Sequence, residues 1–393
     1  MKIRPVLLAL LLCSCHTKEA RWQELSGIAI DLSRQGLYSE ALGPATQSLV
    51  LAEQLFGPKD IRTAYTLDLL GTLRLRKGEF DQAEGLLKRA VALAQEELGS
   101  KDPKLARFVF DLAELRALQG RYDEAQELEL KGLKALQAVY DEISSPVAAA
   151  YARLGALEIK WGRYEEAEHL LRRAQAINER IPEPDPGVQS MIAANMAERL
   201  LQQDDLERAQ DQADRALGLT RLAGEYPPEL APVLVTEGSV LLGRGRLDEA
   251  EGSLLRAIGI YKRYPEANER NLVEANLRLA ALQARRGRAD DAEALYSRLL
   301  PAYERLVGYN HNALVREYLS VADHYKLAGK YDKAEAFYVT ALSRHAEAPG
   351  AEEKDIPVTL MKLSELYKAR GRADLAAGFR KRALEAAKRN AWR

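Results

Sequence analysis

The chain has 393 residues, which is enough for two or three ordinary domains or for one extended array. It carries 57 basic and 58 acidic residues, and no basic run with interleaved aromatics occurs in its interior, so we expect no nucleic-acid partner. Aromatic residues make up only 7% of a composition rich in Ala, Leu, Glu and Arg, which predicts an all-α fold.

The N-terminus differs from the rest of the chain. A short cationic start, residues 1–4, precedes an apolar run over residues 6–12 that is too short to span a bilayer as a helix. The run ends in Leu-Cys-Ser-Cys, residues 12–15, which resembles the lipobox of bacterial lipoproteins. This resemblance implies a signal peptide over residues 1–14, a lipid on Cys15 and a tether over residues 15–20. A plain secretory signal and a chance apolar start are the alternatives.

Two further observations bear on this segment. Cys13 and Cys15 are the only cysteines, so the remainder of the chain has no thiol for a disulfide or a metal. Cys13 follows Leu12, a bulky residue that fits the signal poorly. His16, rather than Asp, follows Cys15, and this resembles the pattern of lipoproteins that are routed to the outer membrane. We therefore expect a bacterial cell-envelope protein, anchored by its lipid and facing the periplasm.

A repeated motif occupies the body of the chain. It reads Gly, a variable residue, an aromatic, two polar or acidic residues and Ala, as in Gly-Arg-Tyr-Asp-Glu-Ala over residues 120–125. The first residues of the nine copies are Gly36, Gly78, Gly120, Gly162, Asp204, Gly245, Gly287, Gly329 and Gly371. Seven of the eight intervals between these anchors are 42 residues and one is 41. Such a period is typical of a repeat architecture.

Helix geometry assigns a role to each residue of the motif. Apolar residues spaced by three and four precede and follow each anchor, which predicts two helices per repeat. The Gly should end the first helix in the left-handed conformation. The acidic residues should lie in the first turn of the second helix, near its positive end. The Ala should lie where the two helices approach closely, and the aromatic should fill the wedge between repeats.

A second set of breaks separates one repeat from the next. Most of the 15 prolines lie there, as at Gly57-Pro58 and Asp102-Pro103, where they should stop the second helix. Pro44 and Pro301 are exceptions. Each falls inside a predicted second helix, which it should kink or shorten.

Together these residues resemble the tetratricopeptide repeat. The resemblance rests on Leu70-Gly71 and Leu154-Gly155 in the first helix, on the turn motif and on an Ala seven residues after it. The 42-residue period and the segment Leu-Gly-Ser-Lys-Asp-Pro-Lys-Leu-Ala, residues 98–106, are similar to the kinesin-light-chain-type variant. The resemblance covers residues 21–393 and implies a right-handed superhelical solenoid. Asp204, Leu206, Ala289 and Ala373 depart from the motif.

No catalytic or cofactor motif emerges from the sequence. The five histidines, at positions 16, 169, 311, 324 and 345, form no metal-binding pair, and Glu165, Glu166 and His169 are typical of a solvated helix face. The chain contains neither a phosphate-binding loop nor a nucleophile elbow. We therefore expect no enzyme activity, metal, cofactor or small-molecule substrate.

The resemblance implies a concave surface formed by the first helix of each repeat. Its expected positions are Tyr65, Asp68, Thr72, Arg107, Phe110, Glu114, Ala149, Ala152, Ala156, Met191, Ala194, Glu198, Glu274, Leu277, Ala281, Arg316, Leu319 and Asp323. Chaperone-binding relatives hold a partner's C-terminal carboxylate with Lys and Asn at some of these places. Here the Asn positions carry Thr72, Glu114, Ala156, Glu198, Ser239, Ala281, Asp323 and Glu365, so we expect no such clamp.

The sequence therefore predicts a lipid-anchored scaffold that binds a peptide segment or helix of a partner protein in this groove. A basic last helix, residues 372–393, should serve as the terminal cap that an open array needs. Two alternatives are a peptidoglycan- or glycan-binding envelope module and, if the N-terminus is not a signal, a cytoplasmic regulator.

Overall fold

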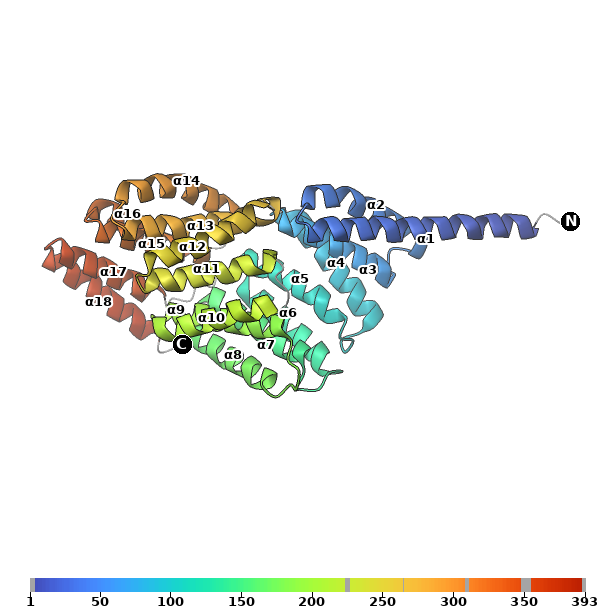
Figure 1. The fold of residues 1–393 in the computed structure, drawn as a ribbon, viewed down its shortest axis with the longest axis horizontal. Coiled ribbons are helices and arrows are strands. Elements are labelled where there is room, and N and C mark those ends of the chain that lie inside the picture. Colours follow the sequence, from blue (N-terminus) through green and yellow to red (C-terminus); the bar gives the residue numbers. More distant parts are fainter. Residues whose placement is uncertain (1–3, 223–226, 264, 308–310, 348–354, 391–393) are drawn as a thin grey trace. The chain divides into compact units, whose positions relative to one another are not determined.

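The computed structural model describes residues 4–222, 227–263, 265–307, 311–347 and 355–390, and within them the side chains of 18–222, 230–263, 268–307, 314–344 and 356–388. The described residues form eighteen α-helices and no strand (Figure 1). The helices are α1 Arg4–Arg34, α2 Tyr38–Phe56, α3 Ile61–Arg76, α4 Phe80–Leu98, α5 Leu105–Leu118, α6 Tyr122–Gln137, α7 Ser145–Trp161, α8 Tyr164–Asn178, α9 Pro186–Gln202, α10 Leu206–Leu222, α11 Pro227–Gly243, α12 Leu247–Arg263, α13 Pro265–Arg285, α14 Ala289–Val307, α15 His311–Leu327, α16 Tyr331–Glu347, α17 Asp355–Ala369 and α18 Ala373–Asn390. The fold is an all-α repeat solenoid.

Each motif anchor lies between the two helices of a pair, as predicted. All eight anchor glycines have positive φ, between 72° and 90°. In the second repeat the N–H of Glu79 donates to the carbonyl of Arg74 at 3.0 Å, which closes the last turn of α3. Asp204 holds the equivalent place at φ 61° and is the only non-glycine residue with positive φ among the described residues. The turn geometry therefore persists where the glycine does not.

The Leu-Gly motif in the first helix marks a close contact with the second helix. A Cβ added at Gly71 would lie 2.8 Å from the Leu87 side chain, and one at Gly155 would lie 2.7 Å from Leu171. Gly238 has the same relation to Leu254, at 2.8 Å. The glycine is thus required by the leucine across the helix pair, since real Cβ atoms almost never approach other heavy atoms so closely.

The alanine and the aromatic of the motif have the predicted environments. The motif alanines of all nine repeats are buried, among them Ala125, which has no exposed surface. Tyr122 is also buried, and its ring stacks on that of Trp161 with centroids 5.9 Å apart. These two residues of the motif therefore serve the packing of the helix pairs.

The two internal prolines do not shorten the helices that contain them. Pro44 lies inside α2 and Pro301 inside α14, and each of these helices has 19 residues, so neither is shortened. Both are second helices that pack along a first helix, and this packing outweighs the one backbone hydrogen bond that each proline removes.

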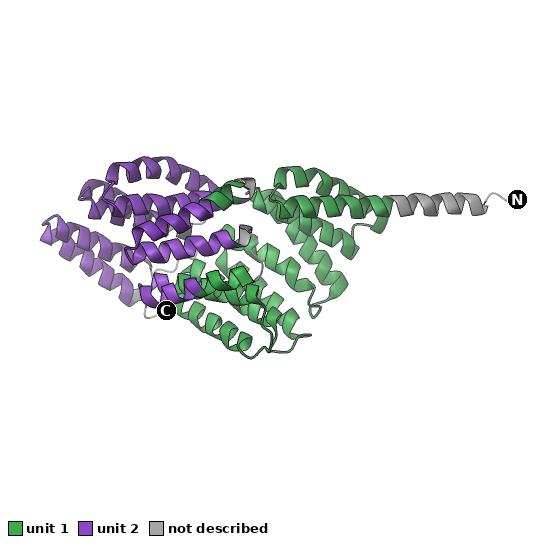
Figure 2. Cartoon of the chain, in the orientation of Figure 1, with its two compact units in different colours: residues 1–199, 215–229, 259–269 green, residues 200–214, 230–258, 270–393 purple. Residues whose placement is uncertain are grey.

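The chain divides into two compact units (Figure 2). Unit 1 comprises residues 1–199, 215–229 and 259–269, and unit 2 comprises residues 200–214, 230–258 and 270–393. The core of unit 1 consists mainly of Ala and Leu, whereas that of unit 2 contains Tyr296, Tyr303, Tyr318, Tyr325 and Tyr338. The two units therefore use different side chains to fill equivalent positions between helices.

Unit 1 also buries a guanidinium. Arg116 is almost completely buried in α5 and donates to Glu84 at 3.0 Å and to the side chain of Gln119 at 2.7 Å. Its Nε lies 3.0 Å from Glu124. Because two carboxylates and an amide surround it, this buried charge is compensated.

The terminal segments can be compared with their predictions only in part. Lipidation at Cys15 and the routing assigned to His16 concern residues whose side chains lie outside the described ones. No helix in the described part of the chain is long and apolar enough to cross a membrane. At the other end, Arg380, Lys381, Arg382 and Lys388 are all exposed on α18, as expected for a polar cap.

Candidate functional site

The first helices α3 and α5 of unit 1 contact one another and bring several predicted groove residues together. Arg107 on α5 donates through Nε to Oδ2 of Asp68 on α3 at 3.0 Å. Its guanidinium lies 5.7 Å from the centre of the Tyr65 ring, and that ring packs on Phe108 with centroids 5.0 Å apart. Tyr65, Asp68 and Arg107 thus form one cluster.

Asp68 differs from its prediction because it is fully buried and cannot meet a partner directly. Oδ2 is covered by Arg107, and Oδ1 has no hydrogen-bond partner. Burial raises the pKa of Asp68 to about 8, and the neighbouring carboxyl of Asp111 adds to this effect. Burial also raises the pKa of Asp111, with a further contribution from Glu114. A buried carboxyl group and a half-buried one therefore lie next to each other.

Two further ion pairs extend the cluster along α3, α5 and α7. Arg76 binds both carboxylate oxygens of Glu114, at 2.6 and 3.0 Å. Burial raises the pKa of Glu114, but the Arg76 guanidinium outweighs it, so the net shift is downward. Arg153 binds Glu129 at 2.8 Å, and burial raises the pKa of Glu129 despite this partner.

Phe110 lies at the centre of this arrangement but shows little free surface. The Arg153 guanidinium lies 4.6 Å from the centre of its ring. On the other side the ring contacts α6, where a Cβ added at Gly132 would lie 2.3 Å from it. Phe110 therefore acts mainly as a packing residue that supports Arg153.

Basic and acidic members of these pairs differ in exposure. The side chains of Arg107, Arg76 and Arg153 are 57, 39 and 35% exposed. Those of their partners Asp68, Glu114 and Glu129 are 0, 29 and 6% exposed. A layer of guanidinium groups thus covers a layer of carboxyl groups. We call this region, formed by Asp68, Arg76, Arg107, Glu114, Glu129 and Arg153, the arginine face.

The other predicted positions of unit 1 contribute less. Thr72 donates its hydroxyl to the carbonyl of Asp68 at 2.8 Å, so it is engaged within α3. Ala152 is buried and its carbonyl accepts from Asn195, which corrects its assignment as an exposed position. Met191 is half-buried and Glu198 is exposed on α9.

In unit 2 the predicted positions are mostly engaged within the unit. Glu274 accepts from Arg270 at 3.0 Å and from the Tyr303 hydroxyl at 3.1 Å. Asp323 accepts from Lys362 at 2.6 Å and also from Tyr338.

Three other predicted groove positions of unit 2 differ from one another in how far they are buried. Arg316 is half-buried, whereas Leu277 and Ala281 are buried, which contradicts their assignment as exposed groove positions. Both belong to core clusters, because the face of α13 that carries them packs against neighbouring helices.

Sequence reasoning missed half of the arginine face. Arg76, Arg153 and Glu129 lie outside the positions expected from the repeat register, and Glu129 belongs to a second helix. Each ion pair joins residues 24 to 39 positions apart. A search for opposite charges about one repeat apart could have found two of the three pairs.

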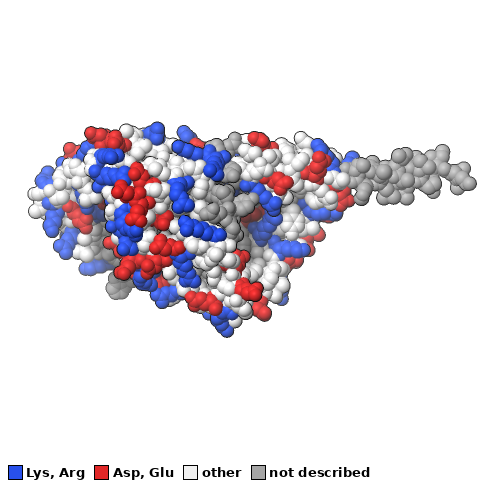
Figure 3. All heavy atoms as spheres, viewed as in Figure 1, with Lys and Arg blue, Asp and Glu red and all other residues white. Residues whose placement is uncertain are grey.

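In the part of the chain that the structure describes, no three His, Cys, Asp or Glu residues come together in a group that could hold a metal ion. On the face seen in Figure 3, basic and acidic residues are interspersed over the surface. This mixture agrees with the near-zero net charge of the chain.

Comparisons with known structures identify the fold. The crystal structure of a Rap protein complexed with competence and sporulation factor matches with a TM-score of 0.61 and 16% identity, over 96% of this chain and 99% of that chain. Aspartyl phosphate phosphatase F from Bacillus subtilis matches with a TM-score of 0.49 and 15% identity, over 93% of each chain. BtubC (BKLC) from P. vanneervenii has 26% identity and a TM-score of 0.46, over 57% of this chain and 91% of that chain.

Comparisons of sequence identify the family. No curated protein has a significant match to the chain. A profile described as tetratricopeptide repeat matches residues 23–96, 68–138, 229–305 and 271–338, and a second with the same description matches residues 147–184. The residues matched by the first profile make up more than half of the chain, and the protein therefore belongs to the tetratricopeptide repeat family.

Proposed function

We propose that the protein is a lipid-anchored, non-enzymatic scaffold of the bacterial cell envelope, which holds a segment of a partner protein on the arginine face. The observation that carries this proposal is that Arg107, Arg76 and Arg153 are each more exposed than the carboxyl group with which they pair. Guanidinium groups form paired hydrogen bonds with carboxylates, so the segment should carry Asp or Glu.

The fold supports a binding role. Tetratricopeptide repeats are generally interaction modules, and the similar Rap protein is complexed with competence and sporulation factor. First helices arranged side by side present a long surface on which an extended segment can make many contacts. Ala149 and Ala156 on α7, both half-buried, leave room for such a segment next to Arg153.

The central experiment compares two arginine variants in full-length, membrane-associated protein. A photo-crosslinking amino acid at Ala156 should capture one dominant protein partner, and Arg107→Ala should reduce this capture at least tenfold. Arg172→Ala is the matched control, because Arg172 is similarly exposed on the second helix α8 and, among the described residues, pairs with Glu168. Equal capture by both variants would refute the assignment of the arginine face.

The anchor and the alternative functions need separate measurements. Labelling with a fatty-acid analogue should occur in the wild type and be lost in Cys15→Ala. Absence of the label in the wild type would contradict the lipid anchor and favour a cytoplasmic regulator. Retention on purified peptidoglycan without any cross-linked protein would favour a glycan-binding module instead.

A further inference from the structure

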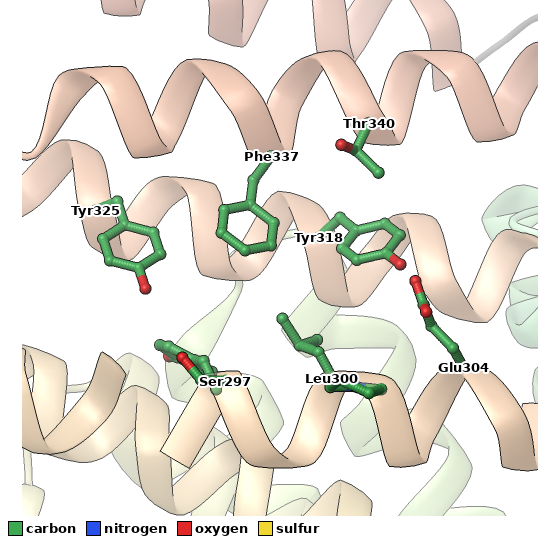
Figure 4. Close-up of a pocket in the computed structure, with 9 residues that line it drawn as sticks. Ser297, Leu300, Glu304, Tyr318, Tyr325, Phe337 and Thr340 are labelled. Carbon is green, nitrogen blue, oxygen red and sulfur yellow. The ribbon is translucent and has the colours of Figure 1, made fainter. Parts of the chain in front are cut away.

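Unit 2 contains a pocket of about 310 Å³ between α14, α15 and α16 (Figure 4). Its lining consists of Tyr296, Ser297, Leu300, Pro301, Glu304, Tyr318, Tyr325, Phe337 and Thr340. In Figure 4, Phe337 and Thr340 descend from α16, whereas Ser297, Leu300 and Glu304 rise from α14. This volume lies at the lower end of the range of small-ligand sites, roughly 300–1,000 Å³.

The pocket has an aromatic wall and one carboxylate. The rings of Tyr325 and Phe337 stack with their centroids 5.6 Å apart, and the ring centroids of Tyr318 and Phe337 are 6.1 Å apart. The hydroxyl of Thr340 donates within its own helix, to Ala336 at 2.9 Å. Glu304 lies at one end, 40% exposed, and Arg344 approaches it only to 3.9 Å, beyond hydrogen-bond distance.

The repeat register explains why this space is open. The residue eleven positions after the anchor is Arg or Lys in seven of the nine repeats: Arg89, Lys131, Arg173, Arg215, Arg256, Arg298 and Arg382. Gln47 and Thr340 are the two exceptions. Thr340 therefore replaces the long cationic side chain that this position usually carries.

In two repeats of unit 1 that cation bridges neighbouring second helices, whereas Arg173 pairs with Glu142, between α6 and α7. Arg89 on α4 lies 2.6 Å from Glu53 on α2, and Lys131 on α6 donates to Gln95 on α4 at 2.7 Å. Glu53, Gln95 and Glu304 all lie seventeen residues after their anchors. Glu304 thus occupies the place of the acceptor, but Thr340 stands where the cation would be, and the ion pair that Glu304 does make is the longer one to Arg344, at 3.9 Å.

We propose that this pocket binds an arginine side chain of a partner protein. This side chain would take the place of the Arg or Lys that most other repeats carry at the position of Thr340. The guanidinium would pair with Glu304, and its plane and methylene groups would lie along Phe337 and Tyr318, since guanidinium groups stack favourably on aromatic rings. At the opposite end Lys333 lies 5.7 Å from the centre of the Tyr325 ring, so a cation is disfavoured there.

The shape of the pocket favours a side chain over a free molecule. Ser297 and Pro301 are exposed at the rim, so a small ligand would stay open to solvent on one side. Small-molecule sites usually bury roughly 70–90% of the ligand surface. An arginine projecting from a larger protein surface would be covered by that surface. This site shares no residue with the arginine face.

The test uses peptide probes on the full chain. Saturation-transfer NMR should detect Ac-Ala-Arg-Ala-NH2 with an affinity on the order of millimolar, as expected for one side chain. Ac-Ala-citrulline-Ala-NH2, which has the same shape without the charge, should bind at least tenfold more weakly. Glu304→Gln should also weaken the arginine peptide at least tenfold while the melting temperature stays within about a degree of wild type. Equal binding of both peptides, or no signal from the arginine peptide, would overturn the proposal.

A second experiment places an arginine in the chain itself, at position 340. Thr340→Arg should restore the bridge to Glu304, abolish peptide binding and raise the melting temperature, and the added Glu304→Gln change should remove that rise. A lower melting temperature in Thr340→Arg would show that the pocket does not accept the side chain. Agmatine, a free guanidinium compound, distinguishes a protein side chain from a small molecule as the ligand. If agmatine binds at least tenfold more tightly than the arginine peptide, the pocket is a small-molecule site.

Discussion

Replacement of Gly155 by Ala tests the close contact within a helix pair. The added Cβ would lie 2.7 Å from both Cγ and Cδ2 of Leu171, whereas ordinary contacts begin near 3.4 Å. Leu171 has no exposed surface and lies in a cluster with Ala152, Ile159 and Ala174, so it has little space into which to move. Overpacking of this kind destabilises a protein by about 1–3 kcal/mol.

A matched glycine separates this effect from helix propensity. Gly85 lies within α4, and a Cβ added there meets nothing within 4 Å. Gly85→Ala should therefore stabilise the protein by about 1 kcal/mol, the usual gain of Ala over Gly in a helix. Gly155→Ala has the same gain but also the steric penalty. The free energies of unfolding of the two variants should differ by about 1–3 kcal/mol.

Urea unfolding followed by circular dichroism measures this difference, and hydrogen exchange of the amides of α7 and α8 localises it. In a double-mutant cycle, Leu171→Ala alone should cost about 2–5 kcal/mol. The combination with Gly155→Ala should cost less than the sum, because the new methyl group occupies part of the cavity. Equal stabilisation by Gly155→Ala and Gly85→Ala would refute the reasoning.

Three further predictions concern charges and turns. Because the pKa of Asp68 is raised to about 8, the wild type should lose stability as pH rises from about 4 to 8. Thermal melts at pH 5 and pH 8 should show a smaller loss in Asp68→Asn. An equal dependence of the melting temperature on pH in both proteins would contradict this prediction. Glu84→Gln should destabilise the protein by about 1–3 kcal/mol at pH 7, because Glu84 is the partner of buried Arg116. In unfolding curves this difference should decrease below about pH 4, where the carboxyl group of Glu84 is protonated in the unfolded chain. Asp204→Gly should stabilise by about 0.5–1 kcal/mol in urea unfolding, because φ is 61° there, and a loss of stability would count against a strained turn.

The helix pairs could be predicted because each motif residue acts locally. Gly120 ends a helix through its own backbone conformation, and the acidic residues after Tyr122 lie in the first turn of the next helix. Neither feature depends on distant parts of the chain. Pro301 shows the limit of such rules, because packing of α14 preserves a helix that the proline alone would interrupt.

The candidate site was predicted less completely. The register placed Tyr65, Asp68 and Arg107 on adjacent first helices, where they do meet. It did not reveal that Asp68 is buried or that Arg153 reaches Glu129 on a second helix. Side-chain direction and burial depend on both neighbouring helices together, and helical spacing describes only one helix at a time.

By itself the sequence determined the number of repeats, the helix pair within each one and the turn between its helices, because these follow from backbone preferences and from a period of 42 residues. Only the tertiary structure decided which charges meet. Arg76 and Glu114 lie 38 residues apart and pair only because α3 and α5 lie side by side. The space beside Glu304 likewise depends on three helices, since it becomes a pocket only where Thr340 faces an aromatic wall. Local rules therefore specify the repeat, and contacts between helices specify its surface.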